Sequence, residues 1–177
     1  MKTNTRKTAL TGMLFALAIA FSMLEAWVTP LLGLPPGVKL GLANIVIMYA
    51  LLFLSRGHAL ALTVLKAGFS LLMRGGMAGL LSLAGSLLSL LVMVLLLLPR
   101  HKPSLVMLSV AGALSHNAGQ LLVVALLLGV PFALGYTAVL LLSGVAMGLL
   151  TALLLRALLP ALARLGLSPP GSTPDKQ

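Results

Sequence analysis

A polar cluster, Ser115–Gln120, lies inside the apolar run from Leu105 to Leu128. That run is long enough to cross a bilayer, which takes about 20 residues. Histidine, asparagine and glutamine side chains at mid-span would meet hydrocarbon, where an unsatisfied polar group costs several kcal/mol. Such side chains normally face a bundle interior or a wet cavity. The cluster therefore predicts a membrane protein whose polar interior contains a binding site.

The spacing of these residues favours one helix face. Ser109, Gly112, His116 and Gln120 recur every three or four positions, and Asn117 lies beside them. Two interpretations are open. The polar groups bind a ligand, or they form hydrogen bonds between packed helices, which contribute ~0.6–2 kcal/mol each. We expect His116, Asn117 and Gln120 to bind substrate, because three strong polar groups exceed what helix packing usually needs.

A second polar face carries Lys66, Ser70 and Arg74 at spacings of four. Arg74 is close enough to the expected outer interface to reach water. Lys66 lies about two turns deeper, where its charge needs an anion, a carbonyl group or water. Three alternatives remain: an ion pair with Glu25, contact with an anionic ligand, or extension toward the interface. We expect Lys66 and Ser70 to contribute to the binding site.

The segment from Pro35 to Asn44 forms a Pro-Gly turn that leads into a helix. The free backbone N–H groups at the start of that helix, together with Lys39, favour an anion there. The alternative is an ordinary turn with an interfacial lysine. We expect Lys39 and Asn44 to close the outer mouth of the site. The ligand is then predicted to be anionic, or amphiphilic with a polar head and an apolar body.

The composition decides the class of protein. The 177 residues are 60% hydrophobic and only 8% charged, whereas soluble domains are about 25% charged. The net charge of +10 comes from basic residues that lie between apolar runs, so membrane orientation explains them better than nucleic-acid binding. The two acidic residues, Glu25 and Asp175, cannot build a carboxylate dyad or a magnesium site. We expect no catalytic residues, no metal and no cofactor.

Glycine and proline divide the chain into six predicted spans, so the fold class is an all-α integral membrane protein. The expected spans are 8–29, 39–54, 59–73, 77–98, 104–128 and 132–159. With the N-terminus inside, nine basic residues lie on the cytoplasmic side and two, Lys39 and Arg74, lie outside. Both termini are thus predicted to be cytoplasmic, with the helical domain over residues 8–160 in a bacterial cytoplasmic membrane.

The regions outside this domain are short. Residues 1–7 form an expected cytoplasmic segment, and residues 161–177 an expected disordered tail. The first apolar run is longer than a usual signal-peptide core, so we expect it to stay as an uncleaved helix. Within it, Gly12, Ala16 and Ala20 form a ridge of small residues that allows helices to approach closely. Packing inside the bundle is the favoured use, and contact with a helix of a partner protein is the alternative.

Several segments resemble one known family, the Gx transporter family, which is also labelled heptaprenyl diphosphate synthase component I. The resemblance covers roughly residues 8–160. It is carried by Pro36–Asn44, Lys66–Phe69, Ser82–Ser89 and Gly112–Gln120.

This family is similar in architecture to the S components of energy-coupling factor transporters. The resemblance implies a six-helix protein that binds a small molecule near the outer face. It also implies that the ridge of Gly12, Ala16 and Ala20 meets a membrane scaffold subunit linked to two ATPases. The leading interpretation is a substrate-binding subunit of a transporter. The alternative is a non-catalytic membrane component associated with heptaprenyl diphosphate or quinone synthesis and partnered by a catalytic prenyl synthase subunit. A scaffold without any ligand is a third possibility.

Overall fold

The described part of the chain folds into six α-helices. The computed structural model describes residues 2–31, 41–99 and 103–164, and it contains no strand in that part. The helices are α1 (Lys2–Leu31), α2 (Leu42–Phe53), α3 (Arg56–Arg74), α4 (Gly76–Leu96), α5 (Leu105–Leu128) and α6 (Val130–Arg164). Their number and order are those of the six predicted segments, whereas the crossing of a membrane by all six stays a prediction. Lys39 and most of the expected C-terminal tail lie outside the described residues.

Two of the helix pairs are joined by single glycines. Gly75 connects α3 to α4 with a φ of 88°, and Gly129 connects α5 to α6 with a φ of 96°. This backbone region is strained for residues with a Cβ but open to glycine. Each glycine N–H also donates to the carbonyl group four residues earlier, on Leu71 and Ala125. The turns therefore reverse the chain in one residue, and they keep the joined helices side by side.

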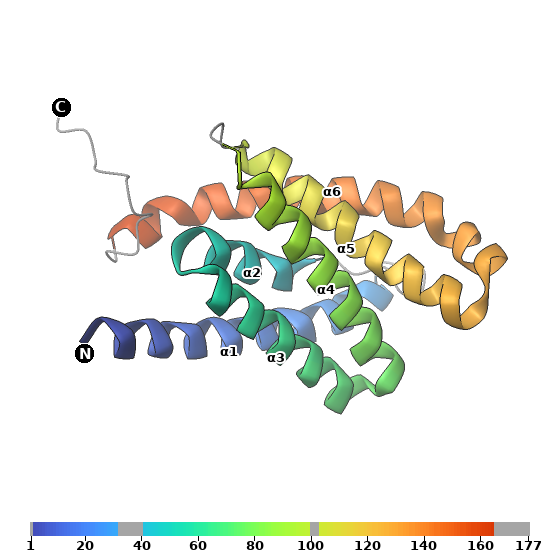
Figure 1. Cartoon of the computed structure of the whole chain (residues 1–177), viewed down its shortest axis with the longest axis horizontal. Helices are drawn as coiled ribbons and strands as arrows, with labels where there is room; N and C mark the ends of the chain where they lie inside the picture. The colour runs from blue at the N-terminus through green and yellow to red at the C-terminus, as the bar shows by residue number, and fades with distance from the viewer. Residues whose placement is uncertain (1, 32–40, 100–102, 165–177) are drawn as a thin grey trace.

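Successive helices run in alternating directions along the bundle (Figure 1). The start of α1, the α2–α3 turn and the end of α6 lie at one end. The α3–α4 and α5–α6 turns lie at the other (Figure 1). Helix α5 packs between α4 and α6, whereas α3 packs against α4 and α1 against α2. This alternation is the arrangement that repeated membrane crossings would give.

Helix α2 is the centre of the hydrophobic core. Its residues from Ile45 to Leu51 are all buried, and they pack with side chains from every other helix. At 12 residues and 1.5 Å per residue it is about 18 Å long, too short for ~30 Å of hydrocarbon. A helix that is apolar on every side is a core helix. Burial inside the bundle explains why α2 is short.

The outer surface of the bundle is apolar. Leu72, Trp27, Leu126 and Leu142 are each at least 75% exposed. Within the residues that the structure describes, four helical segments are long and apolar enough to cross a membrane, namely Lys7–Val28, Gly76–Leu96, Leu105–Leu128 and Val130–Pro160. An apolar exterior of this extent suits lipid rather than water. The structure is thus compatible with a membrane helical bundle, with α2 and α3 outside the set of four.

Candidate functional site

The polar residues of α5 face two neighbouring helices rather than one common site. Ser109 Oγ donates to the Gly148 carbonyl oxygen at 2.7 Å, and Asn117 Nδ2 donates to the Leu140 carbonyl oxygen at 2.6 Å. Both acceptors belong to α6. Close approach is possible there because a Cβ on Gly148 would lie 2.6 Å from Val110 Cα. At Asn117, the structure thus contains the hydrogen bond between packed helices that one of the two interpretations expects.

His116 faces the opposite neighbour, α4. It is 4% exposed. A Cβ built on Gly85 would lie 2.9 Å from His116 Nδ1 and 2.8 Å from its carbonyl oxygen. The imidazole ring thus fits over a glycine, where any larger residue would displace it. The α4 stretch around this glycine is also lined by the buried side chains of Ser82, Ser86 and Ser89.

Lys66 belongs to a second polar group at the start of α2. Its Nζ donates to Asn44 Oδ1 at 2.8 Å, and the side chain is 8% exposed. Glu25 Oε1 accepts a hydrogen bond from the Leu42 backbone N–H at 2.5 Å. The first turn of α2 is therefore held from both sides, by α1 and by α3. The anion at this helix start, among the described residues, is the carboxylate of Glu25 itself.

Two further residues of α3 join it to its neighbours. Ser70 Oγ donates to the Ala78 carbonyl oxygen at 3.2 Å, across the α3–α4 turn. Arg74 Nη2 donates to the Ser22 carbonyl oxygen at 2.8 Å, one turn before Glu25 on α1. Lys66, Ser70 and Arg74, predicted to share one face, thus bond to three different helices, α2, α4 and α1.

The structure brings together only part of the predicted site. Asn44 and Lys66 are in contact. Asn44 and Ser109 also border one small void of about 20 Å³ between α2, α4, α5 and α6. His116 packs against α4, Asn117 bonds to α6, and Gln120 borders a separate cavity. A shared role of Lys66 and the α5 cluster in substrate binding stays a prediction.

The separate cavity lies between α4, α5 and α6 and has a volume of about 240 Å³. Met77 and Leu81 of α4, Val124 of α5 and Phe132 of α6 give it apolar walls. Near its base lie Gln120 and Leu140, which are 4% and 7% exposed. Its volume far exceeds the ~10–15 Å³ that one water needs. The cavity is large enough for part of an organic molecule.

Gln120 is the unusual residue of this cavity. Its side-chain Oε1 and Nε2 are both buried, and neither has a hydrogen-bond partner among the described residues. A buried amide without partners costs free energy in the folded state. Membrane helices seldom carry such a group without a functional reason.

Tyr136 of α6 is not among the residues predicted for a site. The structure places it in the cavity wall beside Phe132, with the two ring centroids 5.3 Å apart. The sequence does contain a signal that Tyr136 lies near Gln120. Because Gly129 joins antiparallel α5 and α6, positions equally far from it lie at similar depth. Tyr136 and Gln120 lie seven and nine residues from that glycine.

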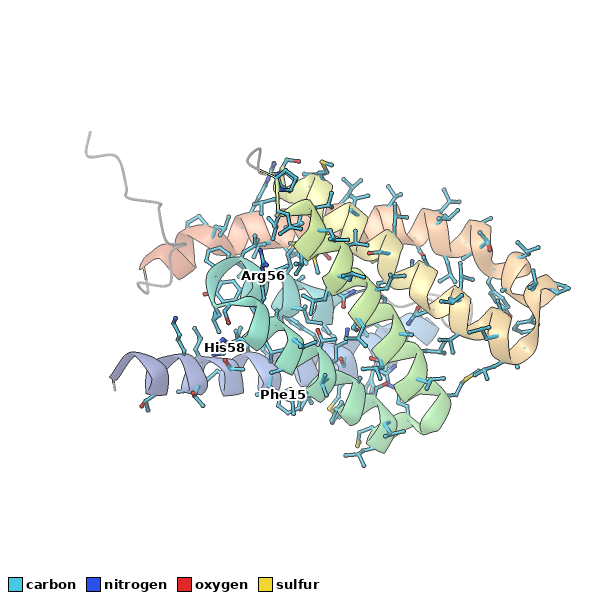
Figure 2. The ribbon with its side chains drawn as sticks, in the orientation of Figure 1. Phe15, Arg56 and His58 are labelled. Carbon is cyan, nitrogen blue, oxygen red and sulfur yellow. The ribbon has the colours of Figure 1, made fainter. Side chains whose placement is uncertain are left out.

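The basic residues described at the bundle ends are unevenly placed. Lys7, Arg56 and Arg156 are exposed at the end where α1 begins, and Figure 2 labels Arg56 and His58 there, at the start of α3. Phe15, also labelled, packs partly buried against the core from α1. Arg74 is at the opposite end. The end with Lys7, Arg56 and Arg156 is called the basic end below.

Comparison with known proteins gives a family match. A family model described as heptaprenyl diphosphate synthase component I matches residues 14–158. Searches of curated proteins and of solved structures gave no match. The family match runs from α1 into α6 and takes in both polar groups and the cavity. The description names one component of a synthase, which agrees with a chain that is not an enzyme by itself. The chain therefore belongs to the heptaprenyl diphosphate synthase component I family.

Proposed function

We propose that the chain is the membrane-embedded, non-catalytic subunit of a heptaprenyl diphosphate synthase. In this role it holds a catalytic partner subunit at the bilayer of a bacterial cytoplasmic membrane. The observation that carries the proposal is the family match over residues 14–158. The apolar exterior supports it, because such a surface suits lipid and leaves only the helix ends for a soluble partner.

The acidic residues support a non-catalytic role. Prenyl transfer needs clustered carboxylates that hold magnesium around a diphosphate. The chain has two acidic residues, and Glu25 is already bonded to the start of α2. Catalysis would have to come from the partner subunit.

The basic end is the proposed docking surface for that partner. Lys7, Arg56 and Arg156 are exposed there, and the positive-inside rule places this end in the cytoplasm. Soluble prenyl synthase activity would be on the same side. Exposed charges of one sign raise the rate of association with an oppositely charged partner. Salt screens this attraction and so weakens it.

Co-expression with a soluble prenyl synthase subunit of the same cell tests the proposal. The tagged chain should retain the synthase in membrane fractions, and deletion of the chain should abolish long-chain prenyl product. Replacing Lys7, Arg56 and Arg156 by alanine should release the synthase, more so at high salt. The matched control is Lys7→Arg with Arg56→Lys and Arg156→Lys, which keeps the charge. A synthase that stays soluble with the chain present, and a deletion strain with unchanged product, would contradict the proposal.

A second candidate, a substrate-binding subunit of a transporter, is favoured by one observation. Gly12, Ala16 and Ala20 are all exposed, and a Cβ on Gly12 would meet no atom within 4 Å. The inward face of α1 carries Leu14 and Ala18 instead. The expectation that the ridge packs inside the bundle is therefore wrong for the described residues. The exposed ridge leaves room for a partner helix.

This candidate predicts a membrane partner linked to ATPases. Gly12→Leu with Ala16→Leu should abolish co-purification of that partner and ATP-dependent uptake, with stability unchanged. Met13→Leu, an exposed change on the same helix, is the control. Intact uptake in the double variant would exclude the ridge as the partner contact.

A further inference from the structure

We propose that the cavity between α4, α5 and α6 binds an uncharged prenyl lipid, whose hydroxyl or carbonyl head forms hydrogen bonds with Gln120. The prenyl chain in this assignment rests on the proposed synthase function. The uncharged head rests on the cavity itself.

The cavity walls determine the body of the ligand. Met77, Leu81, Val124 and Leu128 line it, together with the aromatic pair of Phe132 and Tyr136. No charged side chain lines it among the described residues. A diphosphate carries several negative charges and would lose its hydration in such a cavity without gaining a cation. The head that enters must therefore be neutral.

The shape of the cavity favours a chain-like molecule. Its rim is formed by Met77, Leu128 and Phe132, which are 40%, 53% and 49% exposed. Gln120 lies eight residues before Leu128 on α5, or about 12 Å along the helix. The rim is at the end with the α3–α4 and α5–α6 turns, opposite the basic end (Figure 1). A lipid can thus enter from the bundle surface and reach the buried amide.

Gln120 determines the head. Its carboxamide offers two donors and an acceptor, and both polar atoms are buried without a partner among the described residues. Both atoms are buried in the structure, so ligand binding requires the side chain to turn into the cavity that it borders. A hydroxyl or carbonyl head would then supply the missing hydrogen bond. A purely hydrocarbon end would leave the amide unsatisfied, as would the tail of a prenyl chain.

The test compares three probes on the purified full-length chain: farnesol, farnesyl diphosphate and squalene. They share prenyl character and differ in the head, which is neutral, charged or absent. Binding is measured by native mass spectrometry and by the shift in Tm. Farnesol should bind at least tenfold more tightly than either of the others. Comparable or tighter binding of farnesyl diphosphate or squalene would overturn the proposal, and so would retention of phospholipid alone.

Variants locate the binding. Gln120→Met should weaken farnesol binding at least tenfold, and Val124→Phe should block it by filling the cavity. Ser86→Ala is the matched control, because it removes another buried, unpaired polar group of the described chain that is outside the cavity. It should leave farnesol affinity unchanged. A ligand-free Tm for Gln120→Met at or above that of the parent shows that the variant is folded. Unchanged farnesol affinity in Gln120→Met would refute the role of the amide.

The experiments distinguish a wrong cavity assignment from a wrong synthase proposal. Retention of the catalytic subunit at the membrane depends on the basic end, and its measurement needs no prenyl lipid. If the synthase is retained and farnesol does not bind, only the cavity assignment is wrong.

Discussion

Asn117 and Gln120 are both buried amides on α5, three residues apart, and their surroundings differ. Asn117 donates to the Leu140 carbonyl oxygen at 2.6 Å, and Ser143 Oγ donates to the same oxygen at 3.2 Å. Gln120 has no such acceptor among the described residues. At the residue scale, we expect one amide to stabilise the bundle and the other to lower its stability.

Asn117→Ala should lower the free energy of unfolding by about 1–2 kcal/mol, because it removes a buried interhelical hydrogen bond. Reversible unfolding in mixed micelles measures this loss. Ser143→Ala is the control. It removes only the longer hydrogen bond to the same carbonyl oxygen, and that bond joins two residues of α6. The loss of unfolding free energy should therefore be smaller. Equal losses in the two variants would contradict a stabilising role of the Asn117 contact.

Gln120→Met should have the opposite sign. The substitution keeps the approximate shape of the side chain and removes a buried polar group that has no partner among the described residues. The free energy of unfolding should rise by about 1–3 kcal/mol. Thermal unfolding of the ligand-free chain checks the direction. A stability gain at a site where binding is lost is the expected trade-off at a functional residue. A clear loss of stability would show that the amide has a structural partner.

Helix α2 shows at the element scale how one short segment is held in place. Its first turn is bonded to α1 through Glu25 and to α3 through Lys66 and Asn44. Helix starts favour negative charge, because their N–H groups have no partner within the helix. Glu25 of α1 therefore caps the first turn of α2 by accepting this hydrogen bond.

Substitutions of Glu25 should give graded losses of stability. Glu25→Leu removes the acceptor for the Leu42 N–H and should cost about 1.5–3 kcal/mol, the range for hydrogen bonds to charged groups. Glu25→Gln keeps an acceptor oxygen and should cost less. Chemical unfolding of the two variants side by side gives the comparison. Identical costs would mean that the charge, rather than the hydrogen bond, matters at this position.

The α4–α5 contact depends on glycine. A Cβ on Gly119 would lie 2.7 Å from the Ala84 carbonyl oxygen and 2.9 Å from Gly85 Cα, both backbone atoms. Gly119→Ala should thus separate the two helices and cost about 1–3 kcal/mol. Gly135→Ala is the matched control, since a Cβ there would meet nothing within 4 Å. It should be neutral or stabilising by up to ~1 kcal/mol through helix propensity. Similar effects of both changes on Tm would contradict close packing at Gly119.

The helices and their order follow from local sequence signals, because Gly75, Gly129 and the apolar runs act within a few residues. The direction in which each α5 side chain points could not be derived in this way. His116 and Gln120 lie four residues apart, yet one packs over Gly85 and the other borders a cavity. That difference depends on how α4 and α6 cross α5, which periodicity alone does not determine.

At the scale of the whole molecule, polarity is arranged along the bundle axis. The basic end carries Lys7, Arg56 and Arg156, whereas the cavity rim is at the other end. If the basic end faces the cytoplasm, a catalytic subunit docks there while a prenyl lipid enters from the outer leaflet. The two proposals then use opposite ends of one bundle, and both depend on its orientation.

Cysteine labelling tests that orientation, because the native sequence contains no cysteine. Gly57→Cys and Leu98→Cys place a thiol at the end where α1 begins. Gly76→Cys and Val130→Cys place one at the other end. All four positions are exposed, and none alters a charge that sets orientation. A membrane-impermeant maleimide should label only the Gly76→Cys and Val130→Cys variants in intact cells, and all four variants after the membrane is permeabilised.

The pattern of labels distinguishes the alternatives. Labels at 57 and 98 alone would mean an inverted bundle, with the basic end outside and no access for a cytoplasmic synthase. Labels at 57, 76 and 130, with 98 protected, would mean that α2 and α3, the two helices outside the apolar set of four, do not cross the membrane. Labels at 76 and 130 alone would mean that α3, α4 and α5 each cross the membrane, in alternating directions. Because α2 is about 18 Å long, a crossing by α2 before these three would have to lie within protein rather than within lipid.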